Sequence, residues 1–272
     1  MLSYYCDKII AMPKNNRRYA ASLTGFCIFA FTLFSCNPGA KQPVSTSSGT
    51  PDSLNQNMHM KNQSLLNDPL QSYIDSIQPE ISRIAPERKQ RLQEIAQFVE
   101  DQQAEGLPVN LTFICTHNSR RSHMSQIWAA VAAFYYGVDG VVTFSGGTEA
   151  TAFNPRAVAA MERAGFHVQN PGGENPHYLV SFTDKSPALE CFSKTFDDPF
   201  NPKQHFAAVM TCSEADKNCP LVPGASGRIS IPYQDPKEAD GTAEETARYD
   251  ERCAQIAAEM LYAFSQVESR KN

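Results

Sequence analysis

Cys115 and Arg121 stand at the two ends of a short polar segment, a combination that could bind and attack a tetrahedral anion. Residues 109–115 are apolar and β-branched enough to predict a buried strand, and residues 122–136 have the apolar spacing of a helix. The polar segment is therefore expected to form a loop at the carboxyl end of a strand, directly before a helix.

The backbone amides of such a loop point inward together, and the helix adds the positive end of its dipole. The expected oxyanion-binding residues are Thr116, His117, Asn118, Ser119, Arg120 and Arg121. Arg121 would offer two parallel donors to two oxygens of phosphate or arsenate. A thiol at a helix N-terminus beside a cation loses its proton readily, so Cys115 is expected to be a nucleophilic thiolate that accepts a hydrogen bond from Ser122. The alternative is a buried structural cysteine near two surface arginines.

From about residue 109 to the C-terminus, the chain resembles the low-molecular-weight protein tyrosine phosphatase superfamily, specifically its thioredoxin-coupled arsenate reductase branch. Besides the Cys115 loop, the segments that carry the resemblance are Ser145–Glu149, Asn154–Val158, Gly165–Val168, Val209–Cys212, Asn218–Pro220 and Tyr233–Pro236. The resemblance implies an α/β fold with a central parallel sheet and helices on both faces. It also implies that Asp235 is the general acid that protonates the leaving oxygen, whereas a plain Asp-Pro turn is the alternative.

Cys212 and Cys219 separate the two branches, because phosphatases need neither. In the mechanism that the resemblance implies, Cys115 attacks arsenate, Cys212 attacks the sulfur of the arseno-cysteine and releases arsenite, and Cys219 then attacks Cys212. A thioredoxin-like thiol donor would reduce the resulting disulfide. Both cysteines could instead fill a core. Their spacing exceeds that of a zinc knuckle, so we expect neither a metal nor another cofactor.

Two other functions stay open. Cys115, Arg121 and Asp235 alone would serve a phosphatase acting on phosphotyrosine or small phosphate esters, although residues 237–239 lack the tyrosines that usually follow the Asp-Pro in such enzymes. The third possibility is a tethered oxyanion-binding protein without turnover.

Three residues depart from the family pattern. His117 stands where relatives usually have glycine, and Arg120 replaces a common cysteine. We expect His117 to face solvent, with a third anion contact or a proton carrier as the alternatives. Arg120 is expected to add a second cation near the pocket or at its rim. Gln126 replaces a glutamate that helps some arsenate reductases bind potassium, so no cation site is expected.

The first 35 residues predict a bacterial lipoprotein signal peptide. Basic residues precede a mostly apolar run of 15 residues over 20–34, which is shorter than the roughly 20 residues of a membrane span. The segment 33–36 resembles a lipobox whose cysteine, Cys36, takes the lipid. We therefore expect a protein anchored in a lipid membrane and facing the periplasm, or a cytoplasmic form if translation starts at Met58 or Met60. Export would place the cysteine relay in an oxidising compartment, where its disulfide could stay locked.

The chain is expected to have four parts: the signal peptide (1–35), a disordered tether poor in apolar residues (36–67), a helical extension (68–106) and the catalytic domain (107–272). The apolar spacing of the extension predicts two helices that cover the catalytic domain. Without residues 1–35, 20 basic residues face 28 acidic ones, which argues against a nucleic-acid partner.

Within the catalytic domain, strands alternate with helices in the pattern of a parallel sheet covered on both faces. The expected strands are 109–115, 141–145, 166–168, 207–211 and 228–232, and the expected helices are 122–136, 155–164 and 243–268. Residues 178–196 are extra relative to a minimal family member, and their end could pair as an edge strand and lean over the pocket. Cys191 and Cys253 match no family position and are expected to be structural.

Overall fold

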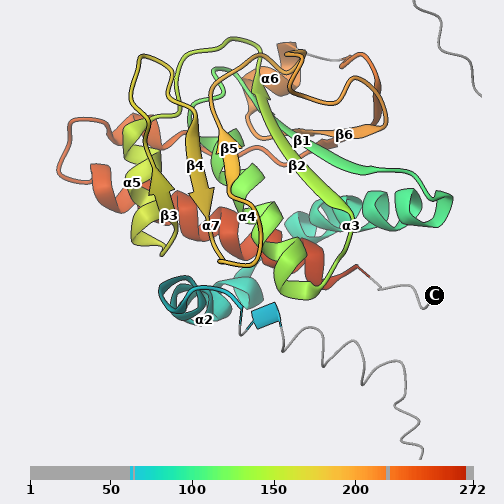
Figure 1. Ribbon diagram of the computed structural model, residues 1–272, viewed down its shortest axis with the longest axis horizontal. Helices are drawn as coiled ribbons and strands as arrows, with labels where there is room; N and C mark the ends of the chain where they lie inside the picture. The colour runs from blue at the N-terminus through green and yellow to red at the C-terminus, as the bar shows by residue number, and fades with distance from the viewer. Residues whose placement is uncertain (1–61, 64, 219–220, 268–272) are drawn as a thin grey trace, which may run out of the picture. The chain divides into compact units, whose positions relative to one another are not determined.

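The computed structural model describes residues 62–63, 65–218 and 221–267 (Figure 1). The predicted signal peptide, Cys36, Met58, Met60 and Cys219 lie outside the described residues. Within the described residues, no helix is both long and apolar enough to cross a membrane.

The central sheet has four parallel strands in the order β2-β1-β6-β7. Their bounds are β1 (Val109–Cys115), β2 (Val141–Gly147), β6 (Phe206–Met210) and β7 (Ala225–Ser230). The inner strands β1 and β6 are almost continuously buried, as parallel strands covered on both faces must be. The register pairs Cys115 with Gly147 and Ile114 with Met210, so the carboxyl ends of three strands meet at one edge.

Helices cover both faces of this sheet, as expected. Leu111 and Phe113 of β1 belong to the large core cluster that the sheet shares with α4 (Arg121–Tyr136) and α7 (Glu245–Ser265), two helices that pack against each other (Figure 1). Ile114 belongs to a smaller cluster on the sheet, together with residues of β6 and of α6 (Ser213–Asn218). The short α5 (Pro155–Arg163) packs on α7.

One predicted strand belongs elsewhere. The strand expected at 166–168 forms as β3 (His167–Gln169), but it pairs antiparallel with β4 (Tyr178–Ser181), not with the central sheet. β5 (Leu189–Cys191) completes this three-stranded antiparallel sheet. The physical reason is that β3 has three residues and none of them is buried, whereas a strand inside a parallel sheet is apolar on both faces.

The extension forms the two expected helices, α2 (Asp68–Arg83) and α3 (Pro86–Glu105), and both pack on α7. The packed part of the chain begins earlier than the predicted tether boundary at residue 67. Leu66 is 5% exposed, Asn67 donates its backbone N–H to Phe182, and Thr183 donates to the carbonyl of Leu65. Leu66 thus belongs to the hydrophobic core, and Leu65 contributes its backbone carbonyl.

Candidate active site

The polar loop lies between the end of β1 at Cys115 and the start of α4 at Arg121. The chain after β2 holds it from one side, because Thr148 and Glu149 donate backbone N–H groups to the carbonyls of Cys115 and Thr116 at 3.2 and 2.8 Å. Gly147 permits this close approach. A Cβ there would lie 2.7 Å from both the Thr116 oxygen and the Asn118 nitrogen.

A directed chain of hydrogen bonds reaches the sulfur of Cys115. The backbone N–H of Lys194 donates to Asn118 Oδ1 at 2.9 Å, and Asn118 Nδ2 donates to Ser122 Oγ at 2.8 Å. A backbone amide can only donate, so the orientation of the Asn118 amide is set. Ser122 accepts from that amide and keeps its own hydrogen for Cys115 Sγ, which lies 3.1 Å away. This arrangement leaves the hydroxyl hydrogen of Ser122 available for the sulfur, and a Cys115 thiolate would accept it.

Asn118 is the loop residue that adopts a left-handed backbone conformation, with a φ of 44°. Asparagine tolerates this region better than most residues. His117, the position where glycine was expected to matter, has no positive φ. Its imidazole is 44% exposed at 3.5 Å from Glu149, in keeping with the predicted solvent-facing placement.

Arg121 and Asp235 lie in one wall of a cavity of about 400 Å³. Arg121 Nη2 donates to Asp235 Oδ2 at 2.7 Å, and Nη1 donates to the carbonyl of Tyr233 at 2.9 Å. Arg121 Nε is buried without a partner among the described residues, so the guanidinium is not fully paired. The cavity is lined by Thr116, His117, Arg121, Ser213, Glu214, Tyr233, Gln234, Asp235 and Glu238. Neither Cys115 nor Arg120 is among these residues.

The side chain of Arg120 contacts α7 and the turn before it, and its Nε also lies 4.0 Å from Asp235 Oδ1 at the cavity. Its Nε donates to the Tyr249 hydroxyl at 2.9 Å, and its Nη2 lies 3.7 Å from Asp240. Burial, with the hydrogen bond to Asp240, raises the pKa of Tyr249 to about 12, so the phenol stays neutral and donates to Asp240 at 2.8 Å. The guanidinium of Arg120 is thus engaged by Tyr249, Asp240 and Asp235, which places a second cation beside a residue that lines the cavity.

Cys212 is buried beside the loop. Its Sγ lies 3.4 Å from Thr116 Oγ1 and accepts a hydrogen bond from the backbone N–H of Ala215 at 3.3 Å. Cys212 and Cys115 belong to the same buried cluster. The structure thus places Cys212 in contact with Thr116, the residue that follows Cys115.

Cys191 and Cys253 are buried away from this chemistry. Burial raises the pKa of Cys191 to about 12 and that of Cys253 to about 11. The indole of Trp128 donates to Cys253 Sγ at 3.3 Å. Both thiols are protonated at neutral pH and serve packing, as the sequence predicts.

Lys194 was not anticipated from the sequence. It is 2% exposed, and burial lowers its pKa to about 8. Its segment contacts the loop, since Thr195 bridges to Gly147 and Ser193 donates to the carbonyl of His117 at 3.0 Å. No residue of 178–196 is among those that line the cavity, so the expected position over the pocket stays a prediction. Lys194 lies 76 residues from Asn118, so no local pattern could have linked the two.

Among the described residues, no three His, Cys, Asp or Glu side chains cluster in a way that could hold a metal ion.

Comparison with known proteins identifies the family of the chain. Arsenate reductase 2 of Staphylococcus epidermidis is 30% identical over 124 residues, which are 46% of this chain and 76% of that protein. The chain belongs to the arsenate reductase family.

Other comparisons accompany this arsenate reductase match. The arsenate reductase of Bacillus subtilis is 29% identical over 154 residues, or 57% of this chain and 93% of that protein. A solved arsenate reductase in the phosphate-binding state is 15% identical with a TM-score of 0.38, covering 59% of this chain and 99% of that chain. No family model matches the chain.

Proposed function

We propose that this protein reduces arsenate to arsenite with its own thiols, using Cys115 as the nucleophile and Cys212 and Cys219 as the relay. The observation that carries the proposal is the position of Cys212, whose sulfur lies 3.4 Å from the hydroxyl of Thr116, the residue after Cys115. A phosphatase needs no second thiol there. The arsenate reductases that the chain resembles support the same reaction.

The proposed first step forms a sulfur–arsenic bond. The Cys115 thiolate attacks arsenate, an As–O bond breaks, and Asp235 supplies the proton with which the oxygen leaves as water. Arg121 would exchange part of its pairing with Asp235 for the oxygens of the anion.

The proposed second step moves two electrons. The Cys212 thiolate attacks the sulfur of Cys115, and the electron pair of the S–As bond passes to arsenic, which leaves as arsenite. Cys219 then attacks Cys212, releases the Cys115 thiolate and leaves a Cys212–Cys219 disulfide. An external dithiol, such as a thioredoxin-like protein, then reduces the Cys212–Cys219 disulfide and is itself oxidised.

The cavity favours a small oxyanion over an aryl phosphate. Glu214 and Glu238 lie in its lining, and Tyr233 and His117 are the described lining residues that carry a ring. Tyr233 is 4% exposed, and its ring packs under Arg88, so it offers no face to a phosphotyrosine ring.

A phosphatase is the second candidate, because the pairing of Arg121 with Asp235 beside Cys115 would also suit phosphoryl transfer. The Cys212→Ser variant separates the two: arsenate reduction should vanish, while any hydrolysis of an aryl phosphate should survive. Cys253→Ser removes another buried thiol and should leave both rates unchanged below its unfolding temperature. Arsenate reduction that persists in Cys212→Ser would disprove the relay. If neither reaction occurs and no oxyanion or phosphate ester traps Cys115 covalently, an oxyanion-binding protein is favoured.

We also propose that the protein is exported and anchored through Cys36, a proposal supported by the sequence of residues 1–36 alone. A dedicated exported thiol donor would then serve the relay. Metabolic lipid labelling of the full chain beside a Cys36→Ala variant tests this, and an unlabelled, soluble wild-type protein would contradict it.

A further inference from the structure

Arg88 of α3 reaches from the extension into the segment that follows β7. Its Nη2 donates to the carbonyl of Ile231 at 3.3 Å, and its guanidinium carbon lies 4.8 Å from the centre of the Tyr233 ring. A guanidinium over an aromatic face is attracted to it in addition to packing against it. One side chain of the extension thus contacts two residues of the segment that leads to Asp235.

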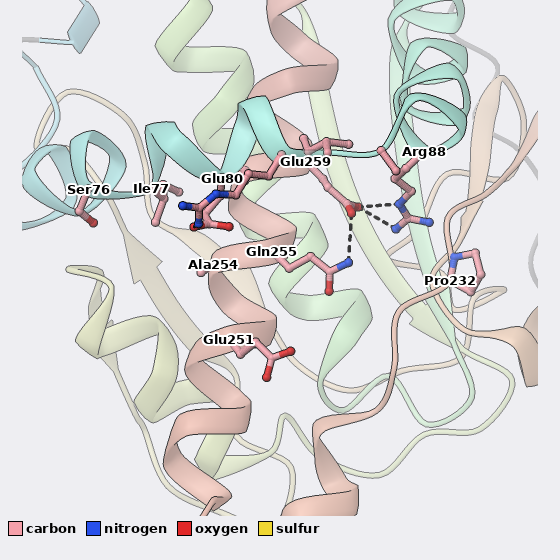
Figure 2. Close-up of a pocket in the computed structure, with 13 residues that line it drawn as sticks. Ser76, Ile77, Glu80, Arg88, Pro232, Glu251, Ala254, Gln255 and Glu259 are labelled. Carbon is pink, nitrogen blue, oxygen red and sulfur yellow. Dashed lines mark hydrogen bonds and ion pairs between the residues drawn. The ribbon is translucent and has the colours of Figure 1, made fainter.

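Glu259 of α7 fixes the position of Arg88. Arg88 Nε and Nη2 both donate to Glu259 Oε2, at 3.0 and 2.7 Å, and Gln255 donates to the other oxygen at 3.1 Å (Figure 2). The side chains of Arg88 and Glu259 are 18% and 4% exposed. A buried carboxylate with both oxygens bonded leaves the guanidinium little freedom.

The other end of this arrangement is the active-site arginine. The carbonyl of Tyr233 accepts a hydrogen bond from Arg121 Nη1 at 2.9 Å, and Asp235 accepts one from Nη2. The backbone N–H groups of Ile231 and Tyr233 donate hydrogen bonds to the carbonyls of Met210 and Thr211, which hold this segment against the end of β6. Arg88 holds the ring of Tyr233 and the carbonyl of Ile231.

We propose that Arg88 is a positioning residue for the oxyanion site, acting through Tyr233 to hold Arg121 in place. The inference rests on the proposed function in one respect, that Arg121 binds the substrate oxyanion. It assigns the helical extension a part in the reaction beyond covering the catalytic domain. Displacing a positioning group by about 1 Å can lower turnover by up to about 100-fold, so we expect the loss of Arg88 to weaken oxyanion binding by about 10-fold or more.

The surroundings of Arg88 allow clean substitutions. Arg88 and Glu259 line a cavity of about 790 Å³ bounded by α2, α3, α7 and Pro232 (Figure 2), so a different side chain at 88 meets no tight wall there. Arg88→Met leaves the buried Glu259 with the Gln255 amide but without its charged partner, which is destabilising in itself. The double variant Arg88→Met with Glu259→Met removes both charges and avoids that penalty. Arg88→Lys retains a cation for Glu259 but loses the planar fork.

The matched control is Arg91→Met on the same helix. Arg91 is exposed, and within the described part of the chain its side chain donates to the carbonyl of Ser230, at 3.4 Å. Each full-length variant is titrated with inorganic phosphate well below its unfolding temperature, and the protection of Cys115 from iodoacetamide gives the Kd. Arsenate reduction is measured in parallel for kcat and KM.

We expect the double variant to raise the phosphate Kd by about 10-fold or more, Arg88→Lys to restore part of the affinity, and Arg91→Met to stay within about twofold of wild type. A purely structural role would lower the unfolding temperature without changing the Kd. A folded double variant with wild-type phosphate affinity overturns the proposal, and so does a wild-type Cys115 that phosphate does not protect. Phosphate binding that depends on Arg88 in a protein without arsenate turnover would disprove the proposed function alone.

Discussion

Replacing Asn118 by aspartate should reverse the hydrogen-bond chain that reaches Cys115. The carboxylate can still accept from the backbone N–H of Lys194, but it has no hydrogen to donate to Ser122. The hydroxyl of Ser122 would then donate to the new carboxylate and no longer to the sulfur. We therefore expect Asn118→Asp to leave the loop in place and to make Cys115 less nucleophilic.

Two effects set the size of the loss. A hydrogen bond to a charged group is worth about 1.5–3 kcal/mol. The new charge would also lie no more than about 6 Å from the sulfur, given bonds of 2.8 and 3.1 Å end to end. Two negative charges at that distance repel by about 3 kcal/mol at an effective dielectric constant of about 20. Either effect lowers the reaction rate of Cys115 by about 10- to 100-fold, since each 1.4 kcal/mol or so is a factor of ten.

The assay is the rate at which iodoacetamide alkylates Cys115 at pH 7, resolved by peptide mass spectrometry because the chain has eight cysteines. Ser122→Ala removes the donor without adding a charge and should lose about 10- to 100-fold. Asn67→Asp is the matched control: the side chain of Asn67 caps α2, aspartate caps equally well, and the rate should stay within about twofold. A folded Asn118→Asp protein that reacts as fast as this control would refute the directed chain.

Three further predictions concern the supports of the site. The pKa of Lys194 is about 8 in the folded protein against 10.5 for a free lysine. Below pH 8 the folded protein carries this buried charge at a cost in stability, and its free energy of unfolding should rise between pH 8 and pH 10.5 as the proton is lost. In urea unfolding, Lys194→Met should therefore be more stable than wild type by up to about 3 kcal/mol at pH 7, and the difference should fade by pH 10.5. Gly147→Ala pushes a methyl group into the loop backbone; it should lower the free energy of unfolding in urea by about 1–3 kcal/mol and lower turnover. In the control Gly227→Ala, the methyl group meets the side chain of Phe98 first, and turnover should stay unchanged. Cys253→Ala leaves the buried indole N–H of Trp128 without its acceptor and should lower the free energy of unfolding by about 1–3 kcal/mol with no change in kcat.

Much of the fold could be predicted because its signals are local. The strand before Cys115, the helix after it and the two helices of the extension follow from apolar spacing, which reflects the face that each element buries. The strand near 167 was assigned to the wrong sheet. Three residues carry too little pattern to distinguish partners that are set by the segment 178–181.

The site divides in the same way. Residue types and order were enough to predict the loop, the two ends occupied by Cys115 and Arg121, and Ser122 beside the sulfur. The placement of Arg120 was not predictable, because its partners Tyr249 and Asp240 come from a distant helix and the turn before it. Asp235 was predicted as an acid, but its pairing with Arg121 came from the structure.

The sequence by itself determined which groups of this protein can react: a cysteine at the end of a strand, an arginine at the start of a helix, and a second cysteine further along. Only the tertiary structure decided how those groups are oriented. The direction of the hydrogen bonds depends on Lys194, the approach of Cys212 depends on the pairing of β1 with β6, and the hold on Arg121 depends on Tyr233. Contacts between residues so far apart in the chain exist only once the sheet register and helix packing are set, and no local pattern encodes them.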